Sequence, residues 1–180
     1  MKAAGLLIFA LLLAAAAPAQ QVKWNYDKLA ARASETVDVS LDGSLLRFAT
    51  KFLSDSDKDE AQVKKLVAQL KGIYVKSFEF KTAGEYSAAD VESFRAPLRA
   101  PEWQRIVGVH SSEDGENVEV YIKSESKGIG GLAIISTGPK ELTLVNIVGA
   151  IDLDTLSELG GHLGIPEVEV DKDKDKDKKK

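Results

Sequence analysis

The sequence predicts an α+β protein: a twisted, mainly antiparallel sheet of about five to six strands, with helices packed on one face. Several short segments alternate apolar and polar residues, which is typical of strands, and others repeat apolar residues at helical spacing. The later strands are separated by tight turns, so consecutive strands should be antiparallel. The expected order is β-α-α-β-α-β-β-β-β-α.

The first strand and helix are predicted near residues 37–52. Val37, Val39 and Leu41 alternate with polar residues, which indicates a strand that ends at Asp42-Gly43. A short helix follows, with Ser44 as its expected cap. Its apolar residues at helical spacing are Leu45, Phe48, Ala49 and Phe52.

A second helix and a second strand are predicted over residues 55–80. Acidic residues at 55–60 favour a helix N-terminus, and Lys71-Gly72 favours its end. The strand at 73–80 is rich in β-branched and aromatic residues. The apolar stripe of the helix is Val63, Leu66, Val67 and Leu70.

A third helix and four further strands complete the domain. Ser87 and Asp90 have the spacing of a capping box, and Pro97 should end that helix near Ala96. Two hairpins are then expected, the first turning at Asp114-Gly115 and the second across Gly138-Pro139-Lys140. The four strands cover 105–110, 117–123, 132–137 and 142–148, and Asp152 should cap a last helix through Leu153, Leu156 and Leu159.

The two ends of the chain differ from the domain in composition. Residues 1–19 have the pattern of a signal peptide, with Lys2, an apolar run and a small-residue cleavage site ending at Ala19. We expect an exported protein, periplasmic or secreted, without stable membrane insertion after cleavage. No cysteine follows the run, so a lipoprotein anchor is not expected. The domain limits are a segment at 20–34, an α+β domain at 35–165 and a disordered charged tail at 166–180.

Charge and composition exclude several classes of function. The net charge is −4, but residues 20–170 hold 17 basic and 24 acidic residues, so the body carries −7 and is a poor nucleic-acid binder. The chain has no cysteine and two histidines, which removes thiolate chemistry and leaves few acid–base groups. We therefore expect no cofactor and favour a non-enzymatic protein.

Two motifs resemble ligand-binding sites, but the residues around them do not fit such sites. Asp55, Asp57 and Asp59 alternate as calcium ligands do, but the sixth and twelfth positions hold Glu60 and Leu66 instead of Gly and an acid. These acids are weak metal candidates and fit an acidic helix start. The glycines at 128–131 are followed by a predicted strand rather than a helix, which disfavours dinucleotide binding.

The remaining candidate residues are a catalytic group at His110 and a partner surface of aromatic residues. His110 adjoins Ser111 and Ser112 at a strand end, but neither serine has the glycines of a nucleophile elbow. Four aromatic residues lie at segment edges and are candidates for contact with a partner, although packing is their commoner fate. They are Trp24, Tyr26, Tyr86 and Trp103.

Several segments carry a resemblance to a known family. The runs at 70–80, 84–87, 103–109 and 118–121, together with 144–153, which ends in Gly-x-Ile-Asp-Leu, resemble the exported bacterial family called domain of unknown function 4252. The resemblance covers roughly residues 29–165. It implies export and supplies no catalytic residues. Many relatives carry a lipid-attachment cysteine after the signal, which this chain lacks.

The sequence leaves three functions open. The favoured one is a cell-envelope accessory or binding protein, with an unknown envelope protein as partner and a possible part in envelope regulation. The alternative is a periplasmic carrier of a small molecule or lipid, which would need an apolar cavity. A hydrolase around His110 is the third and weakest.

Overall fold

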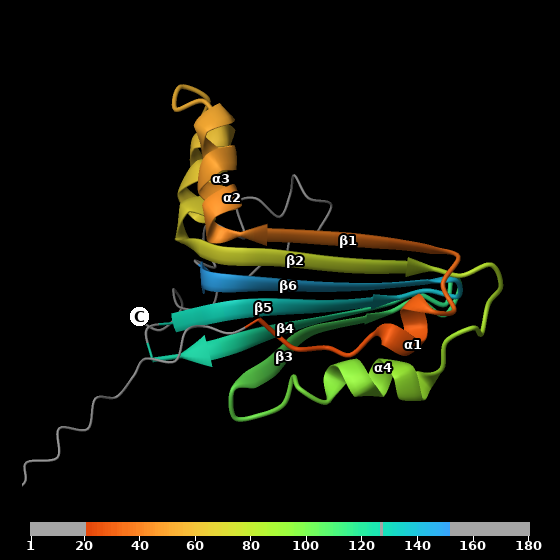
Figure 1. Ribbon diagram of the computed structural model, residues 1–180. Coiled ribbons are helices and arrows are strands. Elements are labelled where there is room, and N and C mark those ends of the chain that lie inside the picture. Colours follow the sequence, from red (N-terminus) through yellow and green to blue (C-terminus); the bar gives the residue numbers. More distant parts are fainter. Residues whose placement is uncertain (1–20, 127, 152–180) are drawn as a thin grey trace, which may run out of the picture.

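The computed structural model describes residues 21–126 and 128–151, which form one six-stranded sheet with short helices (Figure 1). Every pair of neighbouring strands is antiparallel, which confirms the α+β class. The strands are β1 (Glu35–Asp42), β2 (Leu70–Glu79), β3 (Trp103–His110), β4 (Asn117–Glu125), β5 (Gly128–Thr137) and β6 (Glu141–Ile151). The helices are α1 (Asp27–Ala30), α2 (Gly43–Ala49), the 3-10 turn η1 (Thr50–Phe52), α3 (Lys58–Gln69) and α4 (Ala88–Arg95).

The strand order across the sheet is β1-β2-β6-β5-β4-β3. The chain leaves β2, passes through α4 and enters the opposite edge at β3. From there β3 to β6 run back as successive antiparallel strands until β6 pairs with β2. The long connection through α4 therefore places β1 and β3 at the two edges of the sheet.

One face of the sheet is covered by α1, α4 and the residues before α1 (Figure 1). Phe78, Phe80 and Phe94 are almost fully buried there. The N–H of Val22 donates to Asn146 Oδ1 at 2.9 Å, and Asn146 in turn donates to Leu132 O. The described part of the predicted N-terminal segment thus packs on the sheet. Its apolar contacts belong to the same core as those of α4.

The opposite face meets α2 and α3 at one end only. Leu46 of α2 is buried against Leu70, Leu132 and Ile151, and Val67 of α3 packs on the same cluster. The sequence predicted helices on one face. The difference arises because β1 and β2 are joined by a helical hairpin, residues 43–69, that stands off the end of the sheet and leans on its second face (Figure 1).

The start of α2 corrects the predicted cap. The side chain of Asp42, not Ser44, accepts hydrogen bonds from the backbone N–H groups of Ser44 and Leu45, at 2.8 and 2.9 Å. The predicted helix also ends earlier, and η1 replaces its last turn. By contrast, the capping box of Ser87 and Asp90 on α4 is confirmed.

Replacing Asp42 by alanine should lower the free energy of unfolding by about 1 kcal/mol, because two N–H groups of α2 lose their acceptor. Ser44→Ala should change it by less than about 0.5 kcal/mol, because the Ser44 side chain is exposed and caps no N–H group of α2. Urea unfolding of both variants checks the pair. Equal losses would contradict the assignment of Asp42 as the cap.

Some of the predicted segments lie within the described residues, and others lie outside them. The glycines at 128–131 lie in β5, so the chain runs into a strand at this point, as expected. The signal peptide at 1–19, the helix expected from Asp152 and the tail at 166–180 lie outside the described residues. Within the described residues, no helix has the length and apolar character needed to cross a bilayer.

Candidate functional site

His110 and the two serines beside it do not form a relay in the structure. Nδ1 of His110 is hydrogen-bonded to Asn117 Oδ1, across the β3–β4 pair. The hydroxyl of Ser111 donates to Asp114 within the turn, and Ser112 is exposed. The hydrogen bonds of His110 and Ser111 therefore serve strand pairing and turn geometry.

The three aspartates proposed as metal candidates surround the start of α3. Asp57 is the N-cap, and its side chain accepts from the N–H groups of Asp59 and Glu60 at 3.0 and 3.1 Å. Asp55 pairs with Lys64 at 2.7 Å. In the part of the chain that the structure describes, no group of three or more acidic or histidine side chains is arranged to hold a metal ion.

The four edge aromatics hold segments onto the sheet. Trp24 Nε1 donates to Phe94 O at 3.0 Å. The ring of Tyr26 contacts Phe78, and Lys76 Nζ lies 4.7 Å from the centre of the Tyr26 ring. Tyr86 donates from its hydroxyl to backbone carbonyls of the β5–β6 turn. Trp103 is buried in the core, which leaves little of its surface for a partner. For the three half-buried aromatics a partner contact stays a prediction.

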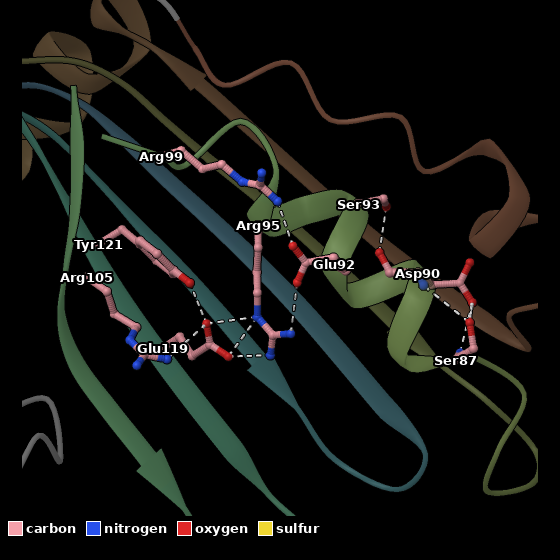
Figure 2. A network of polar contacts seen from close by, with 9 residues as sticks. All are labelled: Ser87, Asp90, Glu92, Ser93, Arg95, Arg99, Arg105, Glu119 and Tyr121. Carbon is pink, nitrogen blue, oxygen red and sulfur yellow. Dashed lines mark hydrogen bonds and ion pairs between the residues drawn. The ribbon is translucent and has the colours of Figure 1, made fainter. Parts of the chain in front are cut away.

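A polar network lies between α4 and the covered face of the sheet (Figure 2). Glu119 of β4 is only 6% exposed, and both of its carboxylate oxygens accept from Arg95 Nε at 3.0 Å. Tyr121 donates its hydroxyl to the same carboxylate, and Arg105 Nη1 lies 4.0 Å away. The outer side of Arg95 contacts Glu92, which also pairs with Arg99. The network ties α4 to β4.

The electrostatics of this network favour a structural role over acid–base chemistry. Burial of Glu119 favours its neutral form, but hydrogen bonds from Arg95 and Tyr121 outweigh burial and lower its pKa. The hydrogen bond to Glu119 raises the pKa of Arg95. A buried carboxylate that stays ionised and already accepts several hydrogen bonds is a weak base at neutral pH.

Tyr121 should make the protein sensitive to alkaline pH. Burial and the nearby Glu119 carboxylate raise the pKa of Tyr121 to about 12, so its stabilising effect is complete below pH 10 and is lost as the pH rises to about 12. Tyr121→Phe should be less stable than the parent protein by about 1–2 kcal/mol near neutral pH, because a hydrogen bond to a charged group is lost. This difference in unfolding free energy should disappear as the pH rises above 10, and denaturant titrations at several pH values measure it. A difference that stayed constant with pH would contradict the role assigned to Tyr121.

A shallow recess of about 310 Å³ opens between the start of α4 and the β5–β6 turn. Its polar side chains already have partners within the protein. Asn117 donates to Thr137, Arg95 is held by Glu119, and Tyr86 is bound to the turn. The capping box fills the N-terminus of α4. The recess therefore presents few unsatisfied groups with which to recognise a ligand.

The helical hairpin carries the most exposed aromatic side chains in the described part of the chain. Leu45 is 50% exposed, Phe48 55% and Phe52 76%; these three residues are here called the hairpin cluster. The rings of Phe48 and Phe52 meet edge to face, with centroids 5.2 Å apart. Large apolar side chains gathered on a projecting surface are typical of contact sites.

The helical spacing of these three residues predicted a helix here and did not specify which of its sides is buried. The structure buries Leu46, one position later than Leu45, so the i, i+3 and i+7 residues face solvent. Leu45 and Leu46 are adjacent, and a helix of two turns can present either one to the core. Spacing alone could not decide between them.

The fold and these contacts define an α+β protein with a six-stranded antiparallel sheet, a covered face held by an ionic network and a projecting helical hairpin. The chain belongs to the family described as Domain of unknown function (DUF4252), whose model matches residues 26–159. This confirms the resemblance seen in the sequence. No curated protein and no solved structure matches the chain.

Proposed function

We propose that the chain is an exported, non-enzymatic binding protein of the cell envelope, and that the hairpin cluster is its contact surface for a partner protein. The exposure of Phe48 and Phe52 on a projecting hairpin carries the proposal. The signal-peptide pattern at 1–19 supports export.

The net charge of the body favours a protein over a lipid surface as the partner of the cluster. The hairpin itself holds four acidic and five basic residues and is nearly neutral, whereas the body at 20–170 as a whole carries −7. Anionic lipid surfaces attract basic segments and repel acidic ones. A projecting pair of phenylalanines on a hairpin of mixed charge suits an apolar groove of another protein, where such side chains act as anchors.

The shape of the molecule supports binding over carriage of a small molecule. Small ligands are held in concave apolar sites of several hundred Å³. Two recesses beside the β5–β6 turn have volumes of about 400 and 310 Å³, but both are shallow and open to solvent, and Glu116, Lys140 and Glu141 line the larger one. The more enclosed hollow beside Val22 and Trp24, at the edge of the covered core, has a volume of about 20 Å³, enough for a single water molecule. The hairpin cluster is convex and therefore suits insertion into a partner.

If the cluster is kept for binding, removing it should cost little stability. Phe52→Ser should change the free energy of unfolding by less than about 0.5 kcal/mol, because the side chain is mostly in solvent. Phe94→Ala, in the buried core, should lower it by about 3–5 kcal/mol. Urea unfolding of the two variants gives the comparison, and a loss of several kcal/mol for Phe52→Ser would assign the cluster to packing.

Photocrosslinking in the organism that makes the protein tests the contact. A photoreactive phenylalanine at position 52 should yield a discrete adduct with another envelope protein, identified by mass spectrometry. The same group at Glu113, exposed in the β3–β4 turn, is the matched control and should not yield that adduct. The adduct should disappear when Leu45 and Phe48 are changed to serine. Adducts of the chain with itself only, with lipid, or with neither would contradict the proposal.

A further inference from the structure

The face of the sheet opposite α1 and α4 carries a large apolar surface that α2 and α3 cover at one end only. We propose that residues 152–165 of the same chain fold back over this surface and cover it. This inference rests on different residues from the proposed function and does not depend on it. The surface, here called the open face, comprises Val37, Val39, Val75, Val107, Val109, Val118, Val120, Ile134 and Val145.

Strand register places one apolar residue from every strand in a single row across the open face. Paired positions run from Val39 through β2, β6, β5 and β4 to Val107 at the far edge. The two end residues are each 37% exposed, and the four between them are half-buried. A row of β-branched side chains on a sheet face is normally packed against a second layer, because removing these apolar side chains from water stabilises the fold.

The described chain ends at the edge of this surface. Ile151 is 8% exposed and packs with Leu46 and Leu132, which lie on the same side of the sheet as the open face. The described chain therefore ends beside the surface that we propose is covered. The family match also continues past Ile151, to residue 159.

The residues after Ile151 have the pattern and length to cover the open face. Asp152 precedes apolar residues at helical spacing, and Gly160-Gly161 interrupts the pattern before further apolar residues. A helix over 152–159 would span about 12 Å, and six more residues would add up to about 20 Å. From Ile151 back to Glu141, β6 is about 33 Å long, so this total reach of about 32 Å nearly matches the length of the open face. The apolar residues are Leu153, Leu156, Leu159, Leu163 and Ile165.

The charges at the far end of the open face support the same path for residues 152–165. Glu35, Glu79 and Glu141 are paired across three neighbouring strands and share the side of the open face, at the end away from the hairpin. All three are exposed. A segment that crosses the face from Ile151 would bring the last ten residues, which hold six Lys and four Asp, toward these acids. Opposite net charges favour that placement.

Disulfide trapping tests the placement in the mature full-length chain, which has no cysteine of its own. Ile134→Cys, on the open face, is combined in turn with Leu156→Cys, Leu159→Cys or Leu163→Cys. A disulfide needs Cα atoms within about 7 Å, so at least one pair should form an intramolecular bond seen as a faster band on a non-reducing gel. Glu92→Cys, exposed on α4 across the sheet, is the matched control and should form none with the same three partners.

A second measurement covers the case in which a cysteine variant fails to fold. Leu156→Ser with Leu159→Ser in the full chain should raise the fluorescence of a dye that binds apolar surfaces severalfold, with the β-sheet circular dichroism retained. Unchanged dye fluorescence would overturn the proposal. So would disulfide-linked dimers from Ile134→Cys alone, which would show a second copy on the face, or equal bonding with the Glu92→Cys control.

Discussion

Gly149→Ala is expected to lower the free energy of unfolding by about 3 kcal/mol, because the position forbids a side chain for two reasons. Gly149 has φ of +133°, a backbone conformation that residues with a side chain rarely adopt. A Cβ atom there would also lie 2.7 Å from Gln69 O and 2.7 Å from Leu70 Cα, where β6 passes the junction of α3 and β2. Both are backbone atoms, which cannot move away by a change of rotamer as a side chain could.

Gly84→Ala is the matched control for this prediction. Gly84 also has a positive φ, +85°, but a Cβ atom added to it would meet nothing within 4 Å. Its replacement should cost about 1–2 kcal/mol from the backbone conformation alone. Urea unfolding of the two variants separates the cost of conformation from the cost of close approach. A loss for Gly149→Ala no larger than that for Gly84→Ala would contradict the close contact.

Arg95→Met should lower the free energy of unfolding by about 3–5 kcal/mol, because it leaves the buried Glu119 carboxylate without its charged partner. Arg99→Met is the control. Arg99 is 67% exposed and pairs with Glu92 at the surface, so its loss should cost less than about 0.5 kcal/mol. Chemical denaturation of the two variants measures the difference, and equal effects would show that Arg95 does not support Glu119.

The same pair predicts a dependence on acidic pH. The pKa of Glu119 is lower in the folded protein than its ordinary value of 4.5, so its contribution is complete above that pH. The contribution is lost as the pH falls through the folded pKa. The gap between the parent protein and Arg95→Met should therefore be largest near neutral pH and should narrow in acid. If the difference in unfolding free energy between the parent protein and Arg95→Met grew as the pH fell, it would contradict this prediction.

Much of the sheet could be predicted because strand and turn signals are local. Asp114-Gly115 marks the turn between β3 and β4, and Gly115 indeed has a positive φ. The capping box of Ser87 and Asp90 is a contact within four residues, and it forms as predicted. Local contacts of this kind are decided by the residues themselves.

Features that depend on distant contacts could not be predicted in the same way. Alternation in β4 sets Val118 and Val120 on one face and Glu119 and Tyr121 on the other. Nothing nearby indicates that the charged side is the buried one. It is buried because Arg95, 24 residues earlier and on α4, reaches the Glu119 carboxylate. The exposure of Phe48 likewise depends on which side of α2 meets the sheet.

The role of the hairpin cluster is tested most directly by affinity. Once crosslinking from position 52 has identified the partner, its Kd is measured by calorimetry for the parent protein, Phe52→Ala and the Glu113→Ala control. An aromatic anchor is worth about 2 kcal/mol or more, so Phe52→Ala should weaken binding by about 30-fold or more. Glu113→Ala should bind as the parent does. An unchanged Kd for Phe52→Ala would contradict the claim that this surface binds the partner.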